Sequence, residues 1–207
     1  MHTPSHLVSA RAPGSLLLVL ALGSCGNHTP QPDAAPVEAA APAAHGTAAP
    51  ARTAGTPLAF EPPADWKVQS PTSPMRKAQY LLPRAESDAK DAECVVYFFE
   101  NGGGGVDANV ERWCSQFEQP DGRQSKDVLT RSERTVAGMP VHEVQLSGTF
   151  VAETAPGSGV RLNEPGYRMI AAILDSDHGP YYVKLVGPAA TVAKHEAAFR
   201  DFIGRVH

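Results

Sequence analysis

Hydrophobic residues are densest in the stretch from Glu93 to Phe99, where the last five residues are all apolar. Successive side chains of a strand point to opposite faces, so this run predicts an interior strand that is covered on both sides. Four glycines follow soon after it: Gly102, Gly103, Gly104 and Gly105. We expect the folded part of the chain to be organised around this strand and the segment after the glycines.

An amphipathic helix is predicted from Val106 to Glu118. Its apolar residues recur at offsets of four, three and one, which places them on one stripe of the helix. They are Val106, Val110, Trp113, Cys114 and Phe117. Asp107 stands near the helix start, where a carboxylate favours the positive end of the helix dipole. Pro120 and Gly122 end the helix.

The rest of the chain alternates between expected strands and turns. Strands are expected at 58–60, 66–68, 75–82, 127–136, 141–151, 167–174 and 181–186. The prolines at positions 62 and 63 restrict the first of them to a sheet edge. A terminal helix is expected after Pro188, which suits a first helical turn. This order predicts an α+β fold, with a mainly antiparallel sheet and helices on both of its faces.

Residues 1–24 have the pattern of a bacterial lipoprotein signal peptide. The apolar run from Leu16 to Leu22 is too short to span a bilayer, and Gly23, Ser24 and Cys25 follow it. This ending resembles the bacterial lipobox, in which small residues admit the signal peptidase and the cysteine thiol takes the lipid. We expect lipidation at Cys25; the alternative is an ordinary secretory signal. Gly26 after the cysteine favours the outer membrane, facing the periplasm.

A tether and one folded domain are expected after the signal peptide. Between Gly26 and Gly55 the sequence is rich in Ala and Pro, and Val37 is its one large aliphatic residue. We therefore expect residues 25–57 to hold the lipidated cysteine and a disordered linker, and residues 58–207 to form the domain. The net charge is −4 and there is no basic run. The expected partners are thus the membrane, through the lipid at Cys25, and an unidentified envelope protein, and not nucleic acid.

Four segments of the expected domain occur together in a known group of proteins. They are Pro63-Ala64-Asp65-Trp66, Ser73 to Tyr80, the glycines with Asn109-x-x-Arg112-Trp113-x-x-Gln116-Phe117, and Lys184 to Pro188. They resemble a group of uncharacterised bacterial exported proteins. The layout of that group is similar to the PsbP-like α/β/α sandwich, which a small Ran-binding nuclear import factor shares. The resemblance covers residues 58–207 and implies a binding or assembly role, with no metal or partner residue to transfer.

Three polar residues of the predicted helix form a candidate docking surface. Asn109, Arg112 and Gln116 are spaced by three and four, which makes a stripe beside the apolar one. With the amides of Gly102, Gly103, Gly104 and Gly105, they would bind an anion or a peptide. A solvated helix face, or hydrogen bonds from the helix to the sheet, are the alternatives. Nucleotide binding is not expected, because no Gly-Lys-Ser/Thr or dinucleotide pattern follows the glycines.

Cys94 and Cys114 are the two cysteines that follow Cys25. Exported proteins meet an oxidising compartment, where paired cysteines are usually bridged. Cys94 shares a strand face with Val96 and Phe98, and Cys114 belongs to the apolar stripe of the helix. If the helix covers that strand face, a disulfide is expected; the alternative is two buried thiols.

Catalytic motifs are missing from the sequence, which has no His-Glu-x-x-His, Cys-x-x-Cys or Gly-x-Ser-x-Gly. We expect no enzyme, metal or cofactor. Asp175, Asp177 and His178 fall in one expected turn, and turn chemistry explains them; a weak cation site or a hydrolase is the alternative.

The main hypothesis is a lipid-anchored envelope protein with a non-catalytic binding or assembly domain, with the glycines and the loop Glu153–Gly166 as contact regions. A carrier of a small ligand or ion is the third hypothesis.

Overall fold

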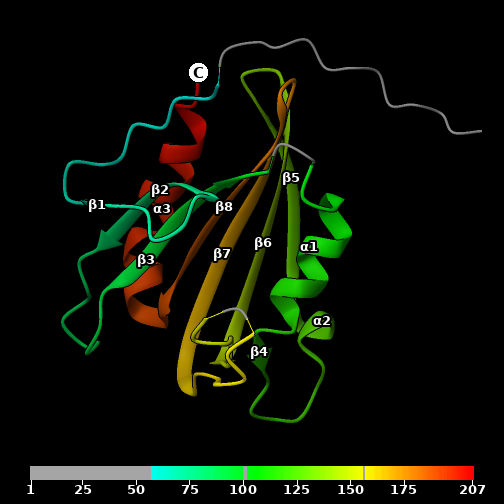
Figure 1. Cartoon of the computed structure of the whole chain (residues 1–207). Coiled ribbons are helices and arrows are strands. Elements are labelled where there is room, and N and C mark those ends of the chain that lie inside the picture. Colours follow the sequence, from blue (N-terminus) through cyan, green and yellow to red (C-terminus); the bar gives the residue numbers. More distant parts are fainter. Residues whose placement is uncertain (1–56, 100–101, 156) are drawn as a thin grey trace, which may run out of the picture. The chain divides into compact units, whose positions relative to one another are not determined.

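The computed structural model describes residues 57–99, 102–155 and 157–207. These residues belong to one compact unit and contain three helices and an eight-stranded sheet (Figure 1). The expected signal peptide, the lipidation site Cys25 and the Ala/Pro-rich linker lie outside the described residues. Within them, no helix is both long enough and apolar enough to cross a membrane.

The apolar run after Glu93 lies in an interior strand, as predicted. The strand β3 (Ala92–Phe98) is paired on one side with β2 (Arg76–Leu82) and on the other with β8 (Gly179–Pro188). The sheet order is β1-β2-β3-β8-β7-β6-β4, and β5 also pairs with β6. The remaining strands are β1 (Lys67–Gln69), β4 (Phe117–Glu118), β5 (Thr130–Val136), β6 (Met139–Phe150) and β7 (Glu164–Ser176). All of these pairings are antiparallel, which confirms the α+β fold with a mainly antiparallel sheet.

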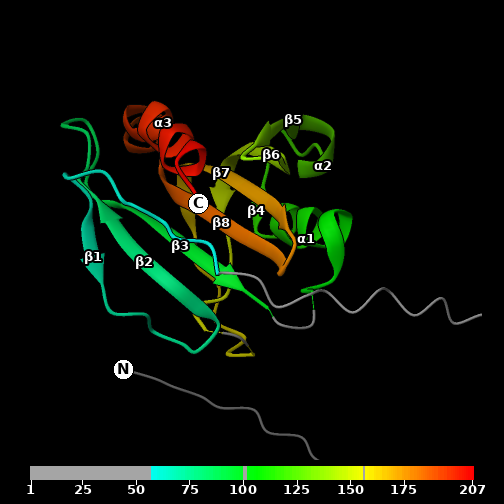
Figure 2. The same cartoon turned by 90° about the horizontal axis from the view of Figure 1, so that it is seen from above.

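Helices pack against both faces of this sheet. Figure 2 shows α3 (Ala189–Gly204) on one side of β7 and α1 (Gly105–Cys114) on the other. The short α2 (Ser125–Val128) lies on the same side as α1. The core accordingly has two clusters, one under α3 and one under α1. Strand alternation feeds both of them, because β3 sends Cys94 and Val96 to the α3 cluster and Tyr97 to the α1 cluster.

The helix α1 is shorter than its apolar stripe predicts. It ends at Cys114, and the backbone amide of Gln116 donates to the carbonyl of Trp113 at 3.1 Å. The chain then turns so that Phe117 pairs with Phe150, at the end of β6. Phe117 is therefore buried from the strand β4 and not from the helix. The strand β4 and the helix α2 were not predicted, because two to four mostly polar residues give no periodic signal.

The disulfide between Cys94 and Cys114 is not formed, which corrects one prediction. Both cysteines are free thiols and both are buried. Cys94 belongs to the cluster under α3, whereas Cys114 belongs to the cluster under α1. Because α1 covers the Tyr97 face of β3 and not the Cys94 face, the sheet separates the two sulfurs. The alternative of two buried thiols describes the structure.

The start of α3 is held by a segment from the other half of the domain. Pro188 precedes the helix and gives it no side-chain cap. The carboxylate of Asp88 accepts hydrogen bonds from the backbone amide of Thr191 at 2.6 Å and from its hydroxyl at 2.7 Å. An acceptor at this place satisfies an amide that the helix itself leaves unpaired. This contact holds the N-terminal end of α3 against the segment that follows β2.

Candidate functional site

A small cavity lies between α1 and the sheet. Its volume is about 170 Å³. One wall comes from the helix and the residues just after it, and the other from β8 and the end of β3. The lining residues are Asn109, Arg112, Trp113 and Gln116 on the helix side, and Tyr97, Phe99, Tyr182 and Lys184 on the sheet side. We call this cavity the α1–sheet pocket.

Aromatic rings form the sheet wall of the α1–sheet pocket. Tyr97 and Phe99 are two residues apart and share a face, and their rings are stacked with centroids 6.3 Å apart. Tyr182 lies opposite Tyr97 in the β3–β8 register, and its ring meets Phe99 edge-on at 5.6 Å. Tyr97 and Phe99 are half-buried, whereas Tyr182 is buried. The pocket therefore offers partly accessible aromatic surface from a rigid sheet.

Lys184 brings a positive charge to this aromatic wall. Its Nζ donates to Oε1 of Gln116 at 2.8 Å and lies 5.6 Å from the centre of the Phe150 ring. Burial lowers the pKa of Lys184 from 10.5 to about 8, because a charged ammonium loses hydration there. Among the described residues, no carboxylate forms an ion pair with this lysine. The ammonium is thus held beside a hollow without a balancing charge in contact.

The carboxylate of Glu93 acts on Lys184, and it already has two partners of its own. It accepts from the guanidinium of Arg76 at 3.1 Å and from the side-chain amide of Gln79 at 2.8 Å. Glu93 acts on the pKa of Lys184 in the raising direction, against the effect of burial, and Arg76 in the lowering direction. Arg112 and Asp175 act on the pocket residue Tyr182, so the described charged groups that influence the pocket are three cations (Lys184, Arg76 and Arg112) and two carboxylates (Glu93 and Asp175).

The predicted polar stripe on α1 is divided between two tasks. Asn109 is only 2% exposed and donates to the carbonyls of Gly103 at 2.9 Å and Gly105 at 2.6 Å. It therefore fixes the glycine segment and is not an exposed docking group. Arg112 is exposed and donates to Oδ1 of Asn109 at 2.7 Å, whereas Gln116 contacts Lys184. Of the three residues, Arg112 and Gln116 thus remain able to contact a ligand in the pocket.

The glycines form the entrance to α1, and their backbone requires glycine. All four have positive φ: Gly102 at 81°, Gly103 at 59°, Gly104 at 95° and Gly105 at 78°. At Gly103 a Cβ would also lie 2.8 Å from the hydroxyl of Tyr182. That hydroxyl donates to the carbonyl of Gly102 at 2.7 Å. The segment is therefore tied to the pocket wall by Tyr182 and to the helix by Asn109.

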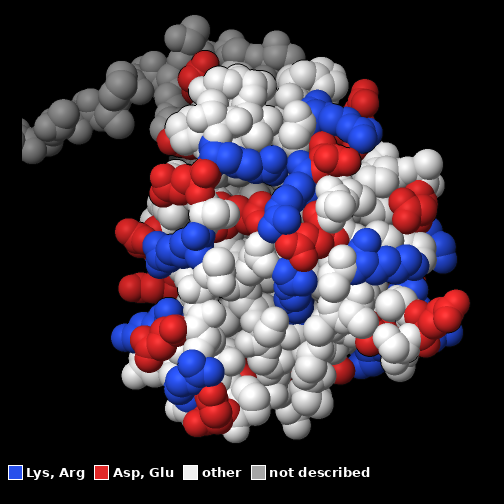
Figure 3. Space-filling model, turned by 180° about the vertical axis from the view of Figure 1, so that it is seen from behind, with Lys and Arg blue, Asp and Glu red and all other residues white. Residues whose placement is uncertain are grey.

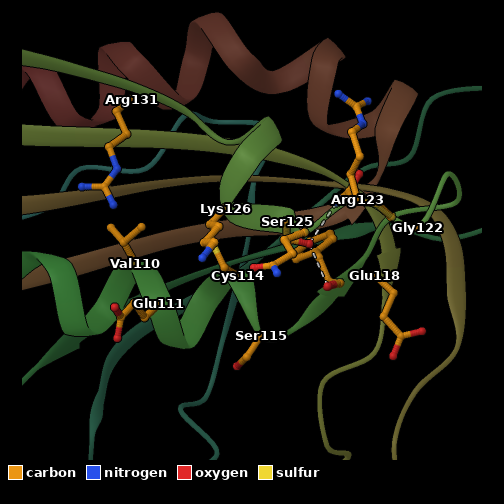
Figure 4. A pocket seen from close by; sticks show the side chains of 13 residues that line it. Val110, Glu111, Cys114, Ser115, Glu118, Gly122, Arg123, Ser125, Lys126 and Arg131 are labelled. Atoms are coloured by element: carbon orange, nitrogen blue, oxygen red, sulfur yellow. Dashed lines mark hydrogen bonds between the residues drawn. The ribbon is translucent and has the colours of Figure 1, made fainter.

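A second hollow, the α1–α2 groove, is larger and more open. It has a volume of about 650 Å³, and Figure 4 shows Val110 and Cys114 between α1 and α2, with Lys126 and Arg131 nearby. Burial raises the pKa of the Cys114 thiol, so the reactive thiolate is disfavoured.

Most charges at the rim of the α1–α2 groove already have partners. Arg131 pairs with Asp107 at 2.9 Å, and Arg123 pairs with Asp121 at 2.7 Å. A ligand would have to compete with these internal pairs. In the α1–sheet pocket, Lys184 and Arg112 form no ion pair with a carboxylate of the described residues, so this pocket is the stronger candidate site.

The other predicted contact regions do not line the α1–sheet pocket. Asp177 and His178 form the turn between β7 and β8, whereas Asp175 lies near the end of β7, opposite Pro180. Both aspartates are exposed, and none of the three residues lines the pocket or the groove, although the charge of Asp175 acts on Tyr182. In the described part of the chain, no three His, Cys, Asp or Glu residues are grouped so as to hold a metal ion. In the loop Glu153–Gly166, Glu153 bridges to Arg161 and Val160 is exposed.

Five residues of the pocket were not predicted as site residues. They are Tyr97, Phe99, Trp113, Tyr182 and Lys184. One signal was present in the sequence, because Lys184 is the only charged residue in the apolar strand 181–186. The aromatic residues gave no such signal, since their pattern is that of ordinary core positions.

Comparisons with known proteins leave the family open. No family model matches the chain, and no curated protein matches it. Among solved structures, the chain is similar to the crystal structure of PA94, a protein of unknown function from Pseudomonas aeruginosa. The sequence identity is 13%, the TM-score is 0.39, and the match covers 61% of this chain and 78% of that chain.

Proposed function

We propose that the protein is a lipid-anchored component of the bacterial cell envelope, with a non-catalytic, PsbP-like domain that binds an acidic group in the α1–sheet pocket. The anchor is the lipid on Cys25, in the outer membrane and facing the periplasm. The lipobox-like ending before Cys25 supports the location. The antiparallel sheet with helices on both faces is the layout expected of a PsbP-like domain.

One observation carries the binding activity. The ammonium of Lys184 is partly buried beside a cavity, with an amide oxygen and an aromatic ring as its neighbours and without a carboxylate in contact among the described residues. Burying a charge costs free energy unless a partner compensates. An acidic ligand group supplies that partner, and it also meets Arg112 at the rim. The role of the domain is therefore to hold a ligand and not to transform it.

The proposal is tested by titrating acidic probes into the full chain, purified from membranes in a mild detergent. The probes are sodium acetate, benzoate, phosphate and sulfate, and heat of binding is measured by calorimetry against a detergent blank. We expect saturable binding of at least one probe, with one site per chain. Lys184→Met should weaken it at least tenfold, because truncating a charged partner of a buried pair costs several kcal/mol.

A matched variant separates the pocket from overall charge. Lys67→Met makes the same charge change at an exposed position of the edge strand β1. Its affinity should equal that of the natural protein, since an exposed and distant charge is screened by salt. The proposal fails if none of the four probes binds, or if Lys184→Met and Lys67→Met behave alike.

A further inference from the structure

The volume of the α1–sheet pocket limits the size of the ligand that it can bind. The cavity has a volume of about 170 Å³. Pockets for drug-sized ligands are larger, at about 300 to 1,000 Å³. The α1–sheet pocket therefore has room for one ring with its acid group, and not for several residues of a peptide.

The walls favour a flat aromatic group over an aliphatic one. Tyr97 and Phe99 are half-buried and stacked, with an angle of 4° between their ring planes. Trp113 lines the same cavity from α1. A ligand ring placed among them makes offset or edge-to-face contacts, which add to the free energy of area burial. A spherical anion would leave these surfaces uncovered.

The charge of the pocket favours a single negative charge. Lys184 is the partly buried cation, and its neighbour Gln116 adds a neutral amide. Arg112 is exposed at the rim, and Arg76 is engaged with Glu93. A monocarboxylate matches one buried ammonium. A phosphate dianion would bring a second charge into a site where bidentate arginine contacts, the usual means of phosphate binding, are not in place.

From this size, wall and charge we infer that the ligand of the α1–sheet pocket is a small aromatic monocarboxylate. Its ring lies against Tyr97, Phe99 and Trp113, and its carboxylate accepts from Lys184. The inference rests on the proposed function and specifies its ligand class.

Four probes of related shape test the ligand class on the full chain in detergent. Benzoate carries both features, cyclohexanecarboxylate lacks the aromatic ring, benzyl alcohol lacks the charge, and inorganic phosphate lacks the ring and carries more charge. Calorimetry gives each dissociation constant, and the fluorescence of Trp113, which lines the pocket, reports occupancy. The control Trp66→Phe removes the second tryptophan, which belongs to the cluster under α3.

We expect benzoate to bind several-fold to about tenfold more tightly than cyclohexanecarboxylate, as aromatic pair contacts predict. Benzyl alcohol should show no saturable binding. Phe99→Leu should reduce the preference for benzoate over cyclohexanecarboxylate, because one of the aromatic contacts is lost, and should leave the affinity for cyclohexanecarboxylate nearly unchanged. Quenching of Trp113 should follow the calorimetric titration in Trp66→Phe.

The contrary results separate this inference from the proposed function. Phosphate or cyclohexanecarboxylate binding as tightly as benzoate, with loss in Lys184→Met, overturns the aromatic carboxylate and retains an acidic-group site. Benzoate binding that survives in Lys184→Met overturns the inferred pose. Absence of binding by every acidic probe overturns both proposals.

Discussion

Lys184 is the residue where fold and function oppose each other. Burial lowers its pKa to about 8, so the folded state disfavours the charged ammonium that an acidic ligand needs. A methionine would fill similar space without this cost. A charged residue that lowers the stability of the fold and lies in a cavity is typical of binding sites, which keep such residues because the ligand needs them.

The pH dependence of unfolding tests this conflict. Between the folded pKa near 8 and the unfolded value near 10.5, the unfolded state holds more protons on Lys184 than the folded state does. Stability contributed by this residue therefore rises with pH through that window. Compared with Lys184→Met, the natural protein should gain about 3 kcal/mol in unfolding free energy between pH 7.5 and 10.5, at about 1.4 kcal/mol per pKa unit.

The difference between the unfolding free energies of the natural protein and Lys184→Met isolates the contribution of the lysine. Tyr80, Tyr97, Tyr167 and Tyr182 all have pKa values raised by burial, which lowers stability as pH rises. Their contribution is common to both proteins and cancels. Urea unfolding of the full chain at several pH values gives the difference. A difference that stays constant with pH would show that Lys184 is not desolvated.

For single residues, the sequence predicted where a side chain lies on its helix or strand, but not which residues it contacts. The spacing of Asn109, Arg112 and Gln116 predicts a polar stripe on one helix, and all three residues line the α1–sheet pocket. The spacing cannot show that Asn109 is buried against the glycines or that α1 ends before Gln116. The disulfide prediction failed for a related reason. Alternation shows that Cys94 and Tyr97 face opposite sides of β3, but only tertiary packing decides which side α1 covers.

At the scale of elements, the site depends on the contact between β3 and β8. Their register places Tyr97 opposite Tyr182 and Val95 opposite Lys184, so the two strands together form the pocket wall. These two strands are 80 or more residues apart in the chain. Their periodic patterns made both strands predictable, but no local pattern specifies the pairing of two distant strands. The pocket was therefore beyond the reach of sequence analysis, although most of its elements were not.

Gly187 shows how closely β8 approaches β3. A Cβ at this position would lie 2.6 Å from the Cβ and 2.7 Å from the Cα of Ala92. Gly187→Ala should therefore destabilise the fold by about 1 to 3 kcal/mol, as overpacking does. It should also weaken benzoate binding, because β8 would shift relative to β3. Chemical denaturation and calorimetry measure the two effects.

Gly204→Ala is the matched control for this change. Gly204 ends α3, and a Cβ there would meet nothing within 4 Å. Alanine is favoured over glycine in helices, so this variant should be neutral or slightly more stable. If Gly187→Ala were equally harmless, the close packing of β8 on β3 would not limit the fold.

At the scale of the whole molecule, positive and negative side chains alternate over the face shown in Figure 3. Figure 3 shows Lys and Arg interspersed with Asp and Glu across the face in view, without a broad area of one sign. Ion pairs such as Arg200 with Glu143 at 3.0 Å, and Arg168 with Glu196 at 2.8 Å, join opposite charges of α3 and its neighbouring strands. Electrostatic attraction to anionic lipids needs clustered basic residues. Attachment of this chain to a membrane should therefore depend on the lipid that we propose at Cys25.

Cys25→Ser tests that dependence directly. The serine hydroxyl cannot take the thioether-linked lipid, and mature lipoproteins need more than one acyl chain for stable attachment. In cells that label their lipoproteins with a palmitate analogue, the natural protein should carry label and sediment with membranes. The variant should lose the label and leave the membrane fraction. Gly26→Ser, next to the anchor, should keep both properties. If Cys25→Ser still sediments with membranes after a high-salt wash, attachment does not run through Cys25, and the envelope part of the proposal is wrong even if the pocket binds its ligand.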